Sequence, residues 1–145
     1  MKYFGVCFTK GGVVPDETKV KDLRAASAPE NSKEALSFIC MAQAVCQDFV
    51  PNFAQLAAPI YRLTHKGVKY EWTEECKKSF KEIKANITSS SLLAPFNPNK
   101  ETRVTVDAAM GVGAAATLWQ RQSSGRWQAV THHSRGFTKS EKNYC

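Results

Sequence analysis

The hydrophobic pattern of this chain changes its period at residues 89–101, and this change limits the folds that the chain can adopt. Before the segment, apolar residues recur every three or four positions, which is typical of amphipathic helices. The segment itself, SSSLLAPFNPNKE, is interrupted by Pro and Asn. After it, apolar and polar residues alternate, which is typical of strands. The sequence therefore predicts an α+β chain in which helices precede an antiparallel sheet, with a domain boundary at this segment.

The residues before the boundary predict a β-hairpin followed by helices. The hairpin consists of the apolar run KYFGVCF, the turn TKGG and the returning run VVPDE. The signals that follow predict a short helix capped by Asp16 and a longer helix that opens at Ser32 and ends before Pro51. They also predict a helix over residues 52–65, which Pro59 kinks or breaks. A last helix is capped by Thr73, and its apolar seam consists of Cys76, Phe80, Ile83 and Ile87.

Beyond the boundary, the alternation predicts strands over residues 103–108, 112–120 and 126–134, joined by short turns as in an antiparallel meander. In the first strand Val104 and Val106 share one face, while Arg103, Thr105 and Asp107 share the other. A sheet of this size leaves one face and at least one edge open, which is a known route to association.

Asp107 is the residue of these strands whose chemistry most needs an explanation. A carboxylate in a strand centre loses hydration, and this loss destabilises the fold unless the carboxylate is paired, hydrogen-bonded or bound to a metal. On the residues alone two interpretations are open, a Mg²⁺ ligand or a strand-end Asp that caps the turn at Met110 and Gly111. His132 and His133 alternate faces in a strand, so they cannot both ligate one ion, and we expect them to be exposed or satisfied in the core.

Basic charge is spread over both halves of the chain. The formal net charge is +7, and residues 1–90 and 91–145 each hold more Lys and Arg than Asp and Glu. This excess favours a polyanionic partner such as nucleic acid.

Several side chains are candidates for contact with that partner. Lys77, Lys81 and Lys84 form a stripe that we expect in solvent on the flank of their helix, where it either follows phosphates or is an ordinary solvated surface. Arg135 is a further candidate for nucleic-acid binding. The tryptophans either stack on bases or are buried, and we expect burial of at least two among Trp72, Trp119 and Trp127.

Cysteine usage and hydropathy point to a protein that stays inside the cell. The cysteines are odd in number and lack CxxC spacing, which disfavours a disulfide framework and a zinc knuckle. They are Cys7, Cys40, Cys46, Cys76 and Cys145. No apolar run is long enough for a transmembrane helix, and the first residues lack the apolar region of a signal peptide. We therefore expect an intracellular protein, in cytoplasm or nucleus, that is not secreted.

Six motifs follow one another along almost the whole chain. They are the F-G hairpin, the PD-x-x-K-V helix, the F-V-P-N-F turn, the A-P-I-x-x-L-T run, the W-T-x-x-x-x-x-x-F-x-x-I-K helix, and the V-D-A strand with Leu118 and Gln120. In this order they resemble the Pol polyprotein of gypsy-type LTR retrotransposons, where reverse transcriptase passes into ribonuclease H.

The resemblance implies three segments. Residues 1–66 would be the end of the reverse-transcriptase palm and the thumb, residues 67–91 a tether with an amphipathic helix, and residues 92–145 the N-terminal part of a truncated RNase H-like domain with an incomplete sheet. The implied partners are RNA/DNA hybrid or duplex nucleic acid and the remainder of the Pol polyprotein, without a membrane.

The resemblance also implies that Asp107 matches the first catalytic aspartate of the nuclease. In such a site, four carboxylates hold two Mg²⁺ ions about 4 Å apart. Glu141 matches a loop position and is not expected to replace a ligand. The polymerase carboxylates are expected upstream of Met1, and the second nuclease carboxylate beyond Cys145. One aspartate cannot hold two divalent ions against their hydration, so we expect no stable Mg²⁺ binding by this chain alone.

The sequence departs from the family pattern at three places, one of which is Phe38, Ile39 and Cys40, where FLG is common in the thumb helix. Ala109 stands where the family usually has Ser, and Cys46, Gln47 and Asp48 stand where it has an aromatic residue and an Arg. The sequence therefore predicts a fragment of a reverse transcriptase/ribonuclease H that is inactive alone. The alternatives are a non-catalytic nucleic-acid-binding or interaction module retained from a retroelement, and an unexpressed remnant.

Overall fold

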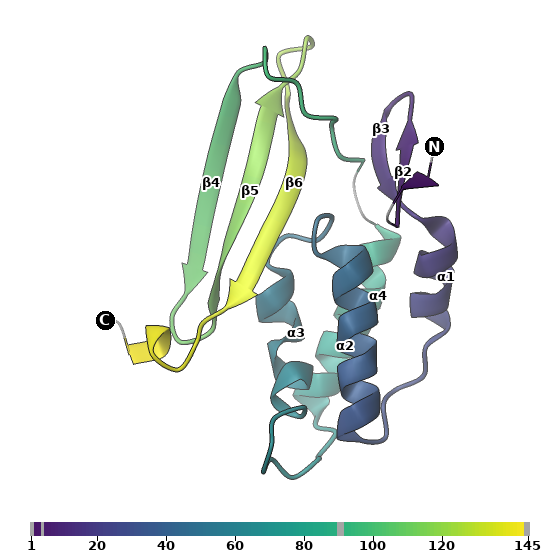
Figure 1. Cartoon of the computed structure of the whole chain (residues 1–145), viewed down its shortest axis with the longest axis vertical. Helices are drawn as coiled ribbons and strands as arrows, with labels where there is room; N and C mark the ends of the chain where they lie inside the picture. The colour runs from purple at the N-terminus through teal and green to yellow at the C-terminus, as the bar shows by residue number, and fades with distance from the viewer. Residues whose placement is uncertain (1, 4, 90–91, 144–145) are drawn as a thin grey trace.

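The computed structural model describes residues 2–3, 5–89 and 92–143, and in it helices precede a long-stranded sheet. The helices are α1 (Glu17–Ala25), α2 (Ser32–Cys46), α3 (Phe53–Arg62), α4 (Glu74–Thr88) and a 3-10 turn η1 (Glu141–Asn143). The strands are β1 (Lys2–Tyr3), β2 (Val6–Thr9), β3 (Gly12–Pro15), β4 (Thr102–Ala109), β5 (Gly113–Arg121) and β6 (Trp127–Gly136). The helices gather beside the β4–β6 sheet (Figure 1). The predicted α+β class is confirmed.

Side-chain caps fix where the helices begin. Asp16 Oδ1 accepts a hydrogen bond from the Thr18 N–H at 3.1 Å, as the sequence predicts. Thr73 caps α4 in the same way. The cap of α2 is Asn31, whose Oδ1 accepts from the Glu34 N–H at 3.0 Å. These bonds satisfy N–H groups that have no partner within the helix.

The helices bury their apolar faces in one shared core. Leu23, Ile60 and Ile83 have no exposed surface at all, and each such side chain stabilises the fold by roughly 1.5–3 kcal/mol. In α4, Phe80 of the predicted seam is only partly buried and Ser79 is buried beside it. The other buried members of this core are Val20, Ala35, Phe38, Ile39, Ala42, Val45, Cys46, Val50, Phe53, Ala57, Leu63, Cys76 and Ile87.

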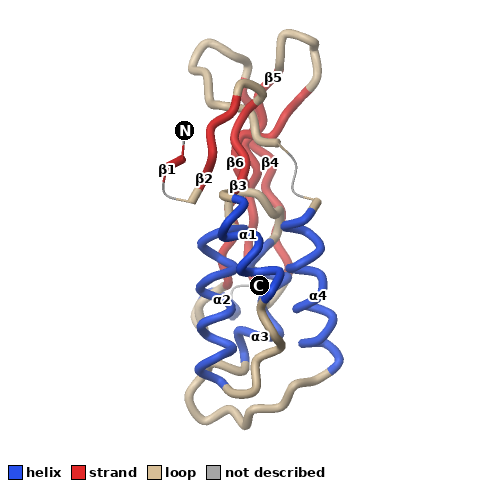
Figure 2. The backbone as a smooth tube through the Cα atoms, turned by 90° about the vertical axis from the view of Figure 1, so that its right-hand side faces the viewer, coloured by secondary structure: helices blue, strands red, loops and turns tan. Residues whose placement is uncertain are grey.

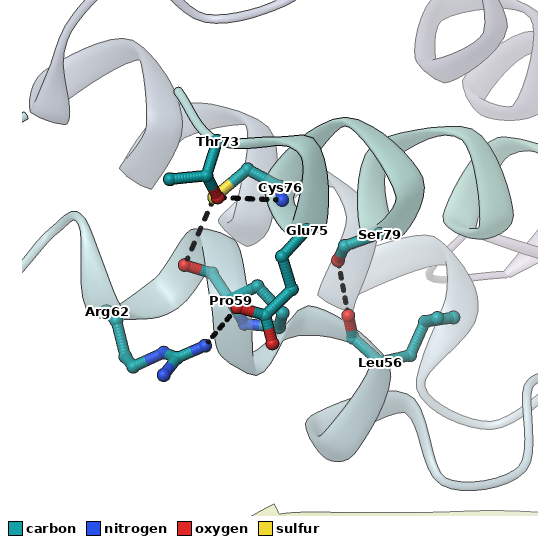
Figure 3. A network of polar contacts seen from close by, with 7 residues as sticks. All are labelled: Leu56, Pro59, Arg62, Thr73, Glu75, Cys76 and Ser79. Carbon is teal, nitrogen blue, oxygen red and sulfur yellow. Dashed lines mark hydrogen bonds and ion pairs between the residues drawn. The ribbon is translucent and has the colours of Figure 1, made fainter. Parts of the chain in front are cut away.

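Polar side chains of α4 contact backbone carbonyl groups of α3, as Figure 3 shows. The Ser79 hydroxyl donates to the Leu56 carbonyl, and the Cys76 thiol donates to the Pro59 carbonyl at 3.6 Å. An exposed ion pair between Arg62 and Glu75, with 2.9 Å between nitrogen and oxygen, lies on the same side (Figure 3). α3 is not broken at Pro59, although a proline cannot donate to the carbonyl four residues before it.

The sheet of β4, β5 and β6 is the predicted antiparallel meander. Register places Asp107 opposite Ala115, and Ala115 opposite Ser134. A β-bulge at Leu118 and Trp119 shifts the register of β5 and β6. β4 is the edge strand farthest from the helices in Figure 1, and the turn ends of the strands project beyond the helices in Figure 2.

The connecting segment after α4 joins the two sheets through backbone hydrogen bonds. Val13 of β3 and Leu93 exchange two bonds, with N···O distances of 2.8 and 3.0 Å. The next residue, Ala94, donates to the Ala129 carbonyl of β6 at 2.8 Å. The predicted hairpin is present as β2 and β3, and β1 pairs with β2 to add a third strand to it.

The F-V-P-N-F turn between α2 and α3 contributes to two hydrophobic cores. Phe49 is 4% exposed and packs in a small second core with Leu93 and Ala129, whereas Val50 and Phe53 pack in the helical core. The turn therefore fixes the sheet against the helices.

Every helix within the described ranges is too short or too polar to serve as a transmembrane segment.

Gly12 allows the close approach of β3 to the connecting segment, and a change to alanine tests this contact. Its φ is +147°, and an added Cβ would lie 2.2 Å from the Leu93 carbonyl oxygen. We expect Gly12→Ala to lower the free energy of unfolding by roughly 2–4 kcal/mol in urea titrations. Gly67→Ala is the matched control, because Gly67 also has a positive φ, +80°, but open space around it, so a loss of about 1 kcal/mol is expected. Equal losses in the two variants would contradict the role of the contact.

Candidate functional site

Asp107 lies on the face of β4 that is turned toward the N-terminus of α3. It lines a shallow hollow of about 70 Å³. The Asn52 amide donates to Asp107 Oδ2 at 3.5 Å, the longest distance at which such a bond is formed. The carboxylate is exposed, so water replaces the partners that a buried strand carboxylate would need. The other residues that line the hollow are Thr105, Val106, Ala115, Ala116 and Thr117.

The N-terminus of α3 is capped by the sheet rather than by its own N-cap residue. Asn52 has a left-handed backbone, with φ at 57°, and its side chain makes no cap hydrogen bond. Instead the Ser134 hydroxyl of β6 accepts from the Ala54 N–H at 2.8 Å. Ser134 and Asp107 both pair with Ala115, so they lie in one row on the same face of the sheet. Because Ser134 binds the start of α3, the positive end of the α3 dipole lies near the Asp107 carboxylate.

The described residues do not form a two-metal site. They contain no group of three His, Cys, Asp or Glu side chains that could hold a metal ion. At the hollow, Asp107 is accompanied by an amide and hydroxyl groups, and this donor set offers one anionic ligand. Mg²⁺ sites that bind without substrate phosphates use more carboxylate oxygens than this, so the residues present do not fit a magnesium pair.

Glu141 is held elsewhere by Arg135. The two Glu141 carboxylate oxygens accept from the Arg135 guanidinium at 2.8 and 2.6 Å, and the Thr138 N–H donates to the same carboxylate at 2.9 Å. The hydrogen bond from Arg135, and to a smaller extent the bond from the Thr138 N–H, lower the pKa of Glu141 to about 2. Arg135 follows Ser134 in β6 and therefore points to the opposite face from Asp107. Glu141 is not a ligand beside Asp107.

The structure separates the three lysines that the sequence groups together. Lys77 and Lys81 are exposed, and Lys77 pairs with Glu74. Lys84 instead donates to the carbonyl groups of Arg24, in the last turn of α1, and of Ala26, which follows the helix; the distance to the Arg24 oxygen is 2.9 Å. Burial lowers its pKa, and its Nζ lies 4.5 Å from the centroid of the partly buried Phe80 ring. The prediction that all three lie in solvent is wrong for Lys84, because spacing around one helix does not show what other elements cover.

His132 belongs to the interface between the sheet and the helices. It is 7% exposed, and its Nδ1 lies 2.8 Å from the Thr117 hydroxyl. Its backbone N–H donates to the Asp48 carbonyl at 3.1 Å. Desolvation lowers the pKa of His132, against a weaker opposite effect of the Asp48 charge. His133 is exposed, so the predicted division of the two histidines is confirmed.

Two tryptophans line a larger cleft of about 460 Å³ between the sheet, the F-V-P-N-F turn and the end of α4. Trp119 Nε1 donates to the Thr105 hydroxyl at 2.9 Å, and the Arg103 guanidinium lies 4.3 Å from the centroid of a Trp127 ring. Trp72, Trp119 and Trp127 are all partly buried, and Trp72 and Trp119 pack against the two hydrophobic cores.

Sequence reasoning found Asp107 but missed the residues that surround it. Asn52 and Ser134 are polar residues of ordinary type in segments assigned to different elements, and no local pattern marks them. The F-V-P-N-F motif was the available signal, because it ends at the start of α3, where both residues contact their partners.

Comparison with known proteins agrees with this architecture. Residues 72–145 match the family described as "RNase H-like domain found in reverse transcriptase". The chain is 32% identical over 142 residues to the retrovirus-related Pol polyprotein from transposon 412 of Drosophila melanogaster, and 25% identical over 144 residues to the transposon Tf2-3 polyprotein of Schizosaccharomyces pombe. These matches cover 97% and 99% of this chain but 11% of each polyprotein.

Solved structures of foamy viral protease-reverse transcriptase share the fold. The form described as "dRH in complex with ds DNA" has a TM-score of 0.78 and 20% identity, and the match covers 100% of this chain and 25% of that chain. The form in complex with RNA/DNA hybrid has a TM-score of 0.77 and 20% identity, and there the match covers 100% of this chain and 19% of the other. At this identity the likeness concerns the fold alone.

The buried position of His132 predicts that the stability of the chain depends on pH. Because its folded-state pKa is lowered, the unfolded chain binds a proton first as the pH falls below about 6.5. The free energy of unfolding should therefore decrease from pH 7 toward the lower folded-state pKa. We expect His132→Gln to flatten this part of the profile in urea titrations, while His133→Gln at the exposed neighbour retains it. A slope that is the same in all three proteins would contradict the assignment.

Proposed function

The chain belongs to the RNase H-like domain family found in reverse transcriptases and is part of a retroelement reverse transcriptase/RNase H region, and we propose that it is a nuclease-side fragment without catalytic activity of its own. The observation that carries this proposal is the lone carboxylate of Asp107. RNA hydrolysis by a magnesium pair needs several carboxylates around both ions. The polymerase and nuclease activities are proposed for the whole polyprotein, and this chain spans 11% of such relatives.

The proposed division of the chain follows its contacts. Residues 1–66 form the palm end and thumb, residues 67–91 the tether, and residues 92–145 the start of the RNase H-like domain. The shared core of α1–α4 supports a helical thumb. The family match begins at Trp72, before α4, so the boundary at residue 92 rests on the change from helices to strands.

Asp107 is proposed as the first aspartate of the nuclease centre in the parent protein. Its place on an open sheet face, with the N-terminus of α3 nearby, supports this role because an anionic substrate or a cation-bound phosphate can approach both. Mg²⁺ would supply an activated water and charge stabilisation in a complete centre. In this chain the set of ligands is too small, so we propose no stable Mg²⁺ binding.

A second candidate is a non-catalytic module that binds duplex nucleic acid. The net charge of +7 and the exposed Lys77 and Lys81 favour it. The neighbouring foamy viral structures are complexes with dsDNA and with RNA/DNA hybrid, which makes these the ligands to test. Arg135 is a weaker candidate, because its guanidinium already binds Glu141. The remainder of the Pol polyprotein is the proposed protein partner, inside the cell.

The inactive-fragment proposal is tested with an RNA/DNA hybrid carrying a labelled RNA strand in the presence of Mg²⁺. The 145-residue chain should give no more cleavage than Asp107→Asn, because both lack the other carboxylates. An active ribonuclease H added to the same substrate serves as the positive control. Cleavage by the unchanged chain that disappears in Asp107→Asn would overturn the proposal.

The binding candidate is tested by the salt dependence of affinity for duplex DNA and for hybrid. The logarithm of the association constant should fall linearly with the logarithm of salt concentration, and Lys77→Gln with Lys81→Gln should lower the slope by about 0.9 for each phosphate that the variant no longer neutralises. Lys21→Gln with Lys33→Gln, on α1 and α2, is the control with the same charge change. No binding at low salt, or an equal effect of both double variants, would remove this candidate.

A further inference from the structure

The cleft of about 460 Å³ beside Trp119 and Trp127 has the size and the lining of a site for a small planar group. Binding sites for small molecules typically occupy roughly 300–1,000 Å³ and are mostly apolar and aromatic. The walls of this tryptophan cleft come from β5, β6, the F-V-P-N-F turn, the end of α4 and the connecting segment. The described residues that line it include no Lys, Arg, Asp or Glu. The interior therefore suits a neutral group.

Aromatic side chains supply much of the lining. Trp119 and Trp127 are partly buried, so part of each indole remains accessible from the cleft. Phe49 and His132 are the buried aromatic members, with exposures of 4% and 7%. The rings of Trp119 and His132 meet edge to face, with their centroids 6.4 Å apart. Because this packing holds Trp119 in place, a flat ligand can stack in the cleft without first ordering the indole.

Two arginines lie beside the tryptophans on the same face of the sheet. Arg103 is directly opposite Trp119 in the register of β4 and β5, and its guanidinium lies 4.3 Å from the centroid of a Trp127 ring. Arg121 is opposite Trp127, but its guanidinium already binds Glu101 at 3.2 Å. Arg103 forms no ion pair with any residue in the described ranges, so its charge is available to an anion.

We propose that the tryptophan cleft binds one unpaired nucleotide of a single-stranded nucleic acid, with the base against the indoles and the phosphate at Arg103. The base is flat and uncharged, as the lining requires, and the phosphate attached to it is an anion that a guanidinium binds well. In a duplex the neighbouring base pairs cover the faces of each base, so only an unpaired nucleotide can enter. This site deepens the nucleic-acid-binding candidate, on which it rests, by naming a single strand as the ligand.

Polar side chains at the end of α4 can contact the edge of the base. Asn86 and Ser89 both line the cleft and are exposed. The Asn86 amide nitrogen donates to the Glu82 carbonyl at 2.9 Å, and the Ser89 hydroxyl donates to the Ala85 carbonyl at 3.1 Å. The oxygen atoms of both side chains can therefore accept from N–H groups of a base. Stacking itself tolerates every base, so the site should bind without a strict sequence requirement.

Binding is measured with the whole 145-residue chain by the fluorescence anisotropy of a labelled oligo(dT) of about 12 nucleotides, and of a blunt duplex of equal length. Trp127→Leu should weaken binding to the single strand by about 5- to 100-fold, because a stacked base loses its partner, and should change binding to the duplex by less than about twofold. Trp127 is substituted rather than Trp119, because Trp119 packs against the second core.

Trp127→Phe should retain most of the affinity for the single strand, because it keeps an aromatic ring at the same position. Tyr61→Ala is the matched control, since it removes an exposed aromatic ring of α3 that does not line the cleft, and it should bind like the unchanged chain. The urea midpoint of each variant shows whether it is folded.

The phosphate contact has its own measurement, which also applies if Trp127→Leu does not fold. Arg103→Gln should lower the salt slope of single-strand binding by about 0.7, the value for one phosphate that is no longer neutralised. Lys21→Gln, on α1, makes the same charge change away from the cleft and should retain the slope.

Three outcomes would overturn this site. They are no binding of the single strand at low salt, an equal effect of Trp127→Leu on single strand and duplex, and an unchanged salt slope in Arg103→Gln. The duplex-binding candidate fails or succeeds separately, because Lys77 and Lys81 affect duplex affinity whereas the cleft variants affect only the single strand.

Discussion

The turn from Phe49 to Phe53 is the contact on which the rest of the structure depends, because its side chains belong to both hydrophobic cores. Phe49 packs with Leu93 and Ala129, while Val50 and Phe53 pack among the helices. A buried side chain of this kind contributes roughly 1.5–3 kcal/mol, which is a large share of the net stability of a domain. The orientation of the sheet therefore follows from a few residues. That orientation also determines which residues of the helices lie near Asp107.

The period of the hydrophobic pattern was enough to predict the order of the elements. It separated helices from strands correctly because burial on one face acts on every residue of an element, and many positions therefore carry the same signal. It could not predict that β1 adds a third strand to the N-terminal sheet, since that pairing involves two residues. It also could not show that Leu93 and Ala94 join the two sheets, because these bonds use backbone groups that any residue carries.

The site was predictable in its chemistry but not in its surroundings. A lone Asp in a Val- and Thr-rich strand, within a V-D-A motif, was sufficient to single out Asp107. Asn52 and Ser134 reach that region only because α3 begins beside the sheet. Lys84 shows the same limit, since its helical spacing is that of a solvent-exposed residue while the end of α1 supplies carbonyl acceptors. Spacing describes one element, and the partners of a side chain come from others.

The exposure of β4 determines how the Asp107 carboxylate is solvated. An exposed carboxylate keeps its hydration, so the fold tolerates Asp107 without a paired cation, and for the same reason the site holds no strong electrostatic attraction for Mg²⁺ by itself. Further ligands would have to lie on the same face of β4 as Asp107. Additional carboxylates on that face would raise the affinity of the site for cations. The number of ligands around Asp107, rather than its exposure, therefore decides whether a magnesium pair can bind.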